Sequence, residues 1–190
     1  MAENESPFSL KNHFLLAMPN LPDDQFSQSL TYICDHSDDG AMGIVINKPL
    51  QLNLAKLLDH IDITPTINTL EQIPVLNGGP VQGEQGFVLH RLPGQWQSSL
   101  IIEDEVQLTT SKDILQAIAS QPYEEDYIVA LGYAGWGKGQ LEQEIANNAW
   151  LYCKADYDIL FQTPIDKKLE EAARLLGVDW HLISPDAGHA

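Results

Sequence analysis

Glycine is concentrated in two segments of this chain, and such clusters limit the backbone paths that the chain can take. Four glycines surround Trp136 within residues 132–139, and a helix-like pattern follows from Gln140. Glycine loses more backbone entropy on folding than any other residue, so a cluster indicates positive φ angles or a group that approaches the backbone closely. Residues 77–81 and 86–91 have the same character. Both segments predict a built site, although neither matches a motif with a known reaction.

Apolar runs divide the rest of the chain into short strands and helices. Residues 26–34 alternate in character, which predicts a half-buried strand with Tyr32 on the buried face and Thr31 on the other. The turn at residues 38–40 then predicts an antiparallel hairpin with residues 41–47. The predicted strands are 13–18, 26–34, 41–47, 75–76, 86–90, 100–102, 106–108, 126–133 and 150–153, and the predicted helices are 52–61, 112–120, 140–148 and 164–176.

Residues with suitable capping chemistry mark the ends of these helices. Asn53 and Ser111 are the predicted N-caps, and Gly177 is the predicted glycine after the last helix. Hairpin-like runs come first and the later helices do not alternate regularly with strands, which predicts an α+β fold with a mixed sheet. The length of 190 residues fits one domain, with residues 1–9 expected as a loose tail.

Composition disfavours some classes of partner. A formal net charge of −17 and a pI of about 4.4 repel phosphate backbones, so direct nucleic-acid binding is disfavoured. Lys167 and Lys168 precede two glutamates and are interpreted as a solvated helix face, not a basic patch. No apolar run approaches roughly 18 residues, so no membrane span is expected. Cys34 and Cys153 are isolated and the N-terminus is acidic, which together predict a cytoplasmic protein.

Motif blocks follow one another along nearly the whole chain. They are Asn-His-Phe-Leu-Leu-Ala-Met-Pro at 12–19, Cys-Asp-His at 34–36, Gly-Ala-Met-Gly-Ile-Val-Ile-Asn at 40–47, Asn-Gly-Gly-Pro-Val at 77–81, Gly-Phe-Val-Leu-His at 86–90, Leu-Thr-Thr-Ser at 108–111, Leu-Gly-Tyr-Ala-Gly-Trp at 131–136, Gly-Gln-Leu-Glu at 139–142 and Gly-His-Ala at 188–190. On these blocks the chain resembles the YqgE/AlgH family of bacterial proteins, also called the UPF0301 or DUF179 group.

The resemblance implies a fold more than an activity. It implies a single compact α+β domain with a coiled or bifurcated, mostly antiparallel sheet and several short helices. Some members are labelled transcriptional regulators, whereas the group as a whole has no established biochemical activity.

Cys34 and His36 lie two residues apart, and therefore on one face if their strand continues. Such a pair could bind a metal ion or activate a thiolate, but the sequence shows no further ligand. The favoured interpretation is structural, with Cys34 in the core and His36 at the turn before Gly40.

His90 ends a predicted strand beside a glycine-rich turn. It could act as a general base, or bind an anion together with the backbone N–H groups of residues 77–79. A structural role, with His90 hydrogen-bonded to a carbonyl, is equally favoured. Trp136 is interpreted as a core anchor before a pocket lid, and Glu142 and Glu144 as acidic residues that suit a helix N-terminus.

These considerations leave three classes of function. The first is a regulatory or binding protein for a small ligand or a protein partner. The second is a hydrolase or transferase that uses His90 with Cys34 and His36 or with Glu142, and the third is a regulator that contacts DNA directly. The candidate ligand-binding residues are Asn77, Gly78, Gly79, His90, Gly135, Trp136, Gln140 and Glu142, with Cys34, His36 and Asn47 as weaker candidates, and no cofactor or metal is predicted.

Overall fold

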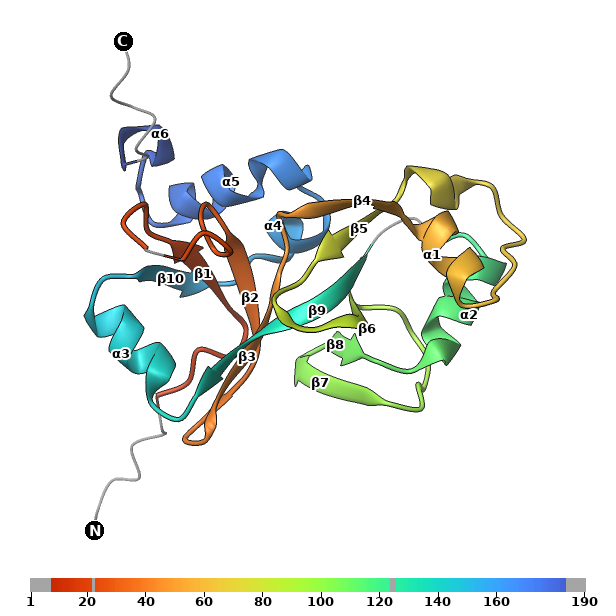
Figure 1. The fold of residues 1–190 in the computed structure, drawn as a ribbon, viewed down its shortest axis with the longest axis horizontal. Coiled ribbons are helices and arrows are strands. Elements are labelled where there is room, and N and C mark those ends of the chain that lie inside the picture. The colour runs from red at the N-terminus through yellow and green to blue at the C-terminus, as the bar shows by residue number, and fades with distance from the viewer. Residues whose placement is uncertain (1–7, 22, 124–125, 184–190) are drawn as a thin grey trace.

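A curled β-sheet dominates the computed structural model, which describes residues 8–21, 23–123 and 126–183 (Figure 1). The strands are β1 (His13–Ala17), β2 (Leu30–Ser37), β3 (Gly40–Val45), β4 (Pro49–Asn53), β5 (Pro74–Asn77), β6 (Val81–His90), β7 (Ser99–Glu103), β8 (Val106–Thr109), β9 (Tyr127–Gly137) and β10 (Trp150–Lys154). The helices are α1 (Leu54–His60), α2 (Lys112–Ser120), α3 (Gln140–Ala146), α4 (Tyr157–Phe161), α5 (Lys168–Leu175) and α6 (Trp180–Ile183), with 3₁₀ turns at Thr69–Gln72 and Ile165–Lys167.

The long strand β9 joins the two halves of the sheet. The strand order is β10-β1-β2-β3-β9-β6-β8-β7, and β4 and β5 branch from it because β5 also pairs with β9. The second half of β9 pairs with β3, whereas its first half pairs with β6 and, in parallel, with β5. The other strand pairs described are antiparallel. The predicted α+β fold, with one mixed and mostly antiparallel curled sheet, is therefore confirmed.

Helices cover the sheet over three separate hydrophobic cores. One core lies between the sheet and α4, α5 and α6, and a second lies beneath α3. The third lies beneath α1 and α2, which stand together at the end of the molecule opposite α3 and α5 (Figure 1). A sheet half with helices on both faces needs apolar side chains on both faces.

Strand β2 shows this requirement and corrects the prediction of a half-buried strand. It begins at Leu30, and every residue from Leu30 to Cys34 is buried. Tyr32 faces the core under α4 and α5, whereas Ile33 faces the core under α3. Thr31 is fully buried as well, so its small polar side chain did not mark a solvent face. The predicted hairpin is confirmed, because β2 pairs antiparallel with β3.

The predicted caps lie where expected, but the predicted helix 164–176 is a 3₁₀ turn at Ile165–Lys167 followed by α5, and α6 comes after it as the last described helix. The Asn53 side chain accepts a hydrogen bond from Lys56 N and caps α1, although Leu52 belongs to β4 and not to the helix. Ser111 occupies the N-cap position of α2, but its hydroxyl donates to Asp113 instead of capping the backbone. Gly177 follows α5 with a φ of +68°, as predicted for its place after the last turn.

Lys168 corrects the prediction that Lys167 and Lys168 share a solvated helix face. The Lys168 side chain is buried, and its Nζ donates to the carbonyl oxygens of Ile159 and Leu160 at the end of α4. The charge therefore satisfies carbonyls that the helix itself leaves without partners. Burial lowers the pKa of Lys168 to about 8.

Two further observations concern the ends of the chain and the helices. Most of the expected tail, residues 1–7, and the Gly-His-Ala block at 188–190 lie outside the described residues. In the described part of the chain, none of the helices has the length and apolar character that crossing a membrane requires.

Candidate functional site

The structure distributes the predicted site residues over three places. Asn77, Gly78 and Gly79 lie at the turn between β5 and β6, against the segment that contains Asn47. Gly135, Trp136, Gln140, Glu142 and His36 gather where β9 runs into α3. His90 lies at the far end of β6, and Cys34 lies in the core under α4 and α5.

His36 and Glu142 form a hydrogen-bonded pair in which neither ring nitrogen of His36 is free to accept or donate another proton. The His36 Nδ1 accepts from Leu10 N at 2.8 Å, which leaves the proton on Nε2, and this proton is donated to Glu142 Oε1 at 2.7 Å. The His36 side chain is 1% exposed. The hydrogen bond from the backbone N–H of Glu142 itself, and then that from His36, lower the pKa of the Glu142 carboxyl. Because both ring nitrogens are engaged, the pair joins the N-terminal segment to α3.

Cys34 and His36 do not form the metal-binding or thiolate pair that was the less favoured alternative, and His36 lies buried within β2 instead of at the turn before Gly40. The pairing of β2 with β3 shifts register between Ile33 and Asp35, and this β-bulge changes the face to which the following residues point. Cys34 therefore packs in the core under α4 and α5, whereas His36 contacts α3 on the other side of the sheet. Burial raises the pKa of the Cys34 thiol, and its core position agrees with the favoured interpretation.

Glu144 has a more specific role than a helix N-terminus requires. Its Oε2 accepts from the indole N–H groups of both Trp136 and Trp150, at 2.9 and 2.8 Å. Gln140 donates to the other oxygen of Glu144 and accepts from Gly137 N. Trp136 is 6% exposed and is the core anchor that the sequence favoured.

His90 is held in one protonation state by a chain of hydrogen bonds. Its Nδ1 accepts from Leu92 N, so Nε2 carries the proton and donates to Thr109 Oγ1 at 2.7 Å. Thr109 in turn donates to Ser99, and Ser99 donates to Gln107. His90 is fully buried, and burial lowers its pKa to about 4.

A hydrolase that uses His90 finds no support in this geometry. The one ring lone pair of His90 faces a backbone N–H, and its partner is a hydroxyl where a carbonyl was expected. Its hydrogen bonds and ring contacts within the described residues do not include Cys34, His36 or Glu142.

The glycines at the β5–β6 turn are explained by the crossing of two strands. A Cβ on Gly78 would lie 2.3 Å from the carbonyl oxygen of Gly132, and one on Gly79 would lie 2.1 Å from the carbonyl carbon of Tyr133. Gly79 and Gly132 also have φ values of +148° and +76°. Each glycine-rich segment therefore leaves room for the backbone of the other. This close approach explains the glycines of both segments, and no ligand is needed to explain them.

A cavity of about 350 Å³ nevertheless opens beside this crossing. Asn77 and Gly79 line it, together with Lys48, whereas neighbouring Asn47 is turned into hydrogen bonds with Leu30 N and Gln28 O. The complete described lining is Gln25, Phe26, Val45, Lys48, Leu50, Asn77, Gly79, Pro80, Gly83 and Leu131.

Lys48 is the residue of this cavity that sequence analysis did not identify. Its Nζ donates to Ser27 O at 2.7 Å, and burial lowers its pKa. Among the described lining residues it carries the only charge, since none is Asp, Glu, Arg or His. A single lysine carries no local signal, and its place depends on the contact of residues 45–48 with the β5–β6 turn.

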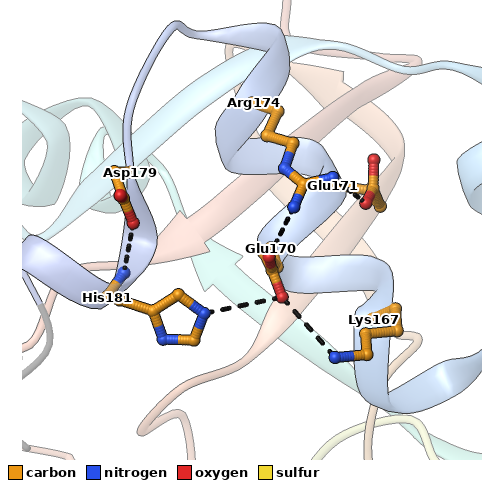
Figure 2. Close-up of polar contacts among 6 residues, drawn as sticks. All are labelled: Lys167, Glu170, Glu171, Arg174, Asp179 and His181. Atoms are coloured by element: carbon orange, nitrogen blue, oxygen red, sulfur yellow. Dashed lines mark hydrogen bonds and ion pairs between the residues drawn. The ribbon is translucent and has the colours of Figure 1, made fainter.

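A second cluster of charges, on α5 and α6, is internally neutralised. Figure 2 shows Glu170 between Arg174, His181 and Lys167, with closest distances of 2.7, 3.7 and 3.8 Å. Arg174 also pairs with Glu171 at 2.6 Å. Each basic side chain in this cluster therefore contacts a carboxylate already, and the arrangement connects α6 to α5.

Tyr32 donates to the buried Asn12 at 2.8 Å, and Asn12 donates to Glu103 at the tip of β7, which links the two halves of the sheet. Within residues 8–21, 23–123 and 126–183, no three His, Cys, Asp or Glu side chains are grouped so that they could hold a metal ion.

Comparison with known proteins places this geometry in a family. The family model described as "DUF179: AlgH-like" matches residues 14–181. A UPF0301 protein of Thioalkalivibrio sulfidiphilus is 57% identical over 179 residues, which cover 94% of this chain and 96% of the relative. A UPF0301 protein of Cupriavidus metallidurans is 46% identical over 190 residues and covers 100% of both chains.

Solved structures agree with this assignment. The solution structure of the AlgH protein from Pseudomonas aeruginosa superposes with a TM-score of 0.78 at 45% identity, over 99% of this chain and 100% of that one. A crystal structure of a Corynebacterium diphtheriae protein shares the fold, with a TM-score of 0.57 at 18% identity over 83% and 81% of the two chains. The chain therefore belongs to the AlgH-like family.

Proposed function

We propose that this protein is a binding protein, and that the cavity beside the β5–β6 turn takes a small anion. One observation carries the proposal: Lys48 is the sole charged residue of the described lining, in a chain whose formal net charge is −17. A cavity that avoids carboxylates in so acidic a protein has a local charge opposite to that of the whole molecule.

The surroundings of Lys48 favour an anionic ligand on energetic grounds. Burial lowers its pKa, which means that the free protein stabilises the charged ammonium poorly. One carbonyl, that of Ser27, satisfies one of its three donors. An anion would accept hydrogen bonds from the other donors of this ammonium and favour its charged form. The distant negative charges act weakly here, because they are screened over about 8 Å at physiological ionic strength.

The size and the remaining lining suit a compact polar molecule. Ligand pockets generally span roughly 300–1,000 Å³, so a cavity of about 350 Å³ lies at the small end. Asn77 and Gln25 offer amide groups, while Phe26, Leu50 and Leu131 offer an apolar wall. This combination fits a small carboxylate or phosphate ester that carries a short apolar portion.

A regulatory role would then depend on occupancy of the cavity. Direct contact with DNA has less support, because a formal net charge of −17 opposes the approach of a phosphate backbone. The proposal takes the protein as cytoplasmic and needs neither a resident cofactor nor a metal ion.

The experiment is a ¹H–¹⁵N NMR titration of the full chain with inorganic phosphate. We expect shifts in residues 45–48 and 77–83, with an affinity at least tenfold weaker in Lys48→Met. Lys56→Met is the matched control, because Lys56 is exposed on α1, is not among the lining residues and removes the same charge. Equal weakening in both variants, or no shift near the cavity, would contradict the proposal.

A second variant tests the cavity without altering charge. A Cβ on Gly83 would meet no atom within 4 Å, and its φ lies outside the left-handed region, so Gly83→Leu should place its side chain in open space at the cavity. We expect it to weaken phosphate binding while the protein stays folded.

A further inference from the structure

A second cavity, of about 430 Å³, lies between α1, α2 and β6. It lies near the first cavity, because Gly83 lines the first, Glu84 and Gln85 line the second, and Leu131 contributes to both. Its described lining is Leu57, Ile61, Asp62, Glu84, Gln85, Gly86, Val88, Thr109, Thr110, Ser111, Lys112, Leu115 and Leu131.

The floor of this cavity is apolar and exists because residue 86 is glycine. Gly86 pairs with Leu131 across the sheet, and Val88 follows it on the same face. A Cβ on Gly86 would meet nothing within 4 Å, and its φ lies outside the left-handed region. Neither backbone conformation nor close packing therefore requires glycine here, in contrast to Gly79.

Glycine inside a strand weakens the strand and often marks the close approach of another molecule. At Gly86 the space that a side chain would occupy is the cavity itself. Leu57, Val88 and Leu115 line the cavity beside it, and each of the three is at most 9% exposed. Apolar surface of this kind gains roughly 25 cal/mol for each Å² that a ligand removes from water.

The rim of the cavity carries two acidic side chains and one basic side chain. Asp62 and Glu84 present carboxylates, and no described side chain donates a hydrogen bond to either. Lys112 is the one basic residue of the described lining, and its Nζ donates to the carbonyl oxygen of Ile61 at 2.6 Å. Its charge therefore stays in the rim beside the two carboxylates.

The other polar groups of the rim have partners within the protein. Ser111 donates to Asp113, Thr110 donates to Ser98, and Gln85 donates to the carbonyl oxygen of Gly86. These groups use their donors within the protein, and the carboxylates of Asp62 and Glu84 are the charged acceptors of the rim that match a cationic donor.

We propose that this cavity binds a small primary ammonium with an apolar body. The body covers Leu57, Val88 and Leu115, and the ammonium donates to Asp62 and Glu84. This site is independent of the anion site at Lys48, so either can fail without the other.

The test compares three probes of equal chain length: n-octylammonium, n-octanol and n-octanoate. Each is titrated into the ¹⁵N-labelled full chain, below its micelle concentration. We expect octylammonium to shift residues 57, 86–88, 115 and 131, with octanoate at least tenfold weaker and octanol between them. Equal affinity for octylammonium and octanoate, or shifts that avoid these residues, would overturn the proposal.

Two sets of variants distinguish the apolar contribution to octylammonium binding from the ionic contribution. Gly86→Leu should fill the cavity and abolish octylammonium binding, whereas Gly83→Leu should leave it unchanged. The double variant Asp62→Asn/Glu84→Gln should retain octanol binding and lose the tenfold preference for octylammonium. Because this double variant alters only the rim, it tests the proposal even if Gly86→Leu fails to fold. An undiminished preference in it would overturn the ammonium assignment.

Discussion

At the scale of single residues, hydrogen bonds decide what each titratable group can do. His90 and His36 both accept a backbone N–H at Nδ1 and donate from Nε2. Neither ring has a free lone pair, so neither serves as a general base in this arrangement. Lys48 differs from both, because its donors exceed the acceptors around it. The candidate site therefore rests on a lysine, whereas the sequence drew attention to the histidines.

His90 should make the protein sensitive to mild acid. Its pKa is lowered from 6.5 to about 4 in the folded state, so the unfolded chain binds the proton first as the pH falls. About 3 kcal/mol of stability is therefore present above pH 6.5 and is lost as the pH falls to 4.

His90→Asn keeps an acceptor near Leu92 N but does not titrate in this range. We expect the difference in unfolding free energy between the wild type and this variant to shrink by about 3 kcal/mol between pH 7 and 4. Urea unfolding at several pH values measures it. A difference that stays constant with pH would show that His90 is not held neutral.

Lys168 should make the stability of the protein depend on pH in the alkaline range. Its pKa is lowered from 10.5 to about 8, so the unfolded state binds more protons between these values and stability rises with pH there. Relative to Lys168→Met, the wild type should gain about 3 kcal/mol of unfolding free energy from pH 8 to 10.5. Denaturant unfolding across this range checks the gain, and parallel pH profiles of the two proteins would refute it.

At the scale of elements, the crossing of the β5–β6 turn with β9 is the least replaceable feature. Gly79→Ala places a Cβ into the backbone of Tyr133 at a φ of +148°, so we expect it to cost more than about 3 kcal/mol or to prevent folding. Gly83→Ala, four residues away in open space, should change stability by less than about 0.5 kcal/mol. Thermal unfolding of both variants tests this contrast, and similar losses would count against the crossing as its cause.

Helix α3 is attached to the sheet through Glu144. Glu144→Leu would leave the indole N–H groups of Trp136 and Trp150 without their acceptor, at a cost of about 1–3 kcal/mol for each buried donor. Glu144→Gln keeps one side-chain oxygen and should lose less. Urea unfolding followed by tryptophan fluorescence compares the two, and an equal loss would show that packing, not hydrogen bonding, secures the helix.

Local patterns were sufficient for several elements and insufficient for others. The β2–β3 hairpin, α2 and the strong strand β9 follow from apolar runs, turns and caps that lie within each segment. Thr31 is buried although it is polar, and Ile33 on the same face packs in the core under α3, which lies more than a hundred residues further along the chain. Alternation within the segment could not indicate that this face is covered. The bulge after Ile33 and the short strand β4 likewise depend on their pairing partners.

At the scale of the whole molecule, the curled sheet sets which residues meet. The two glycine runs come together because β9 serves both halves of the sheet, and this brings Asn77 and Gly79 to one cavity with Lys48. The same curl holds His90 apart from Cys34, His36 and Glu142. The sequence could identify the family and the glycine turns, but Lys48 lacked any motif, and its partners depend on pairing between distant strands.

The two cavities differ in the charged side chains that line them. Lys48 is the one charged residue of the first described lining, whereas the second contains Asp62, Glu84 and Lys112. Such neighbouring sites of opposite character are a property of the assembled sheet, and net charge alone does not reveal them.

If Lys48 binds a small anion, the pKa of Lys48 itself should respond to that anion, and this response can be measured. Heteronuclear NMR of the lysine side chains can follow this pKa without phosphate and with saturating phosphate. In the free protein it should lie below the usual lysine range, because burial lowers it. Phosphate should raise it toward that range. A Lys48 pKa that phosphate leaves unchanged would contradict the assignment of Lys48 as the anion-binding residue.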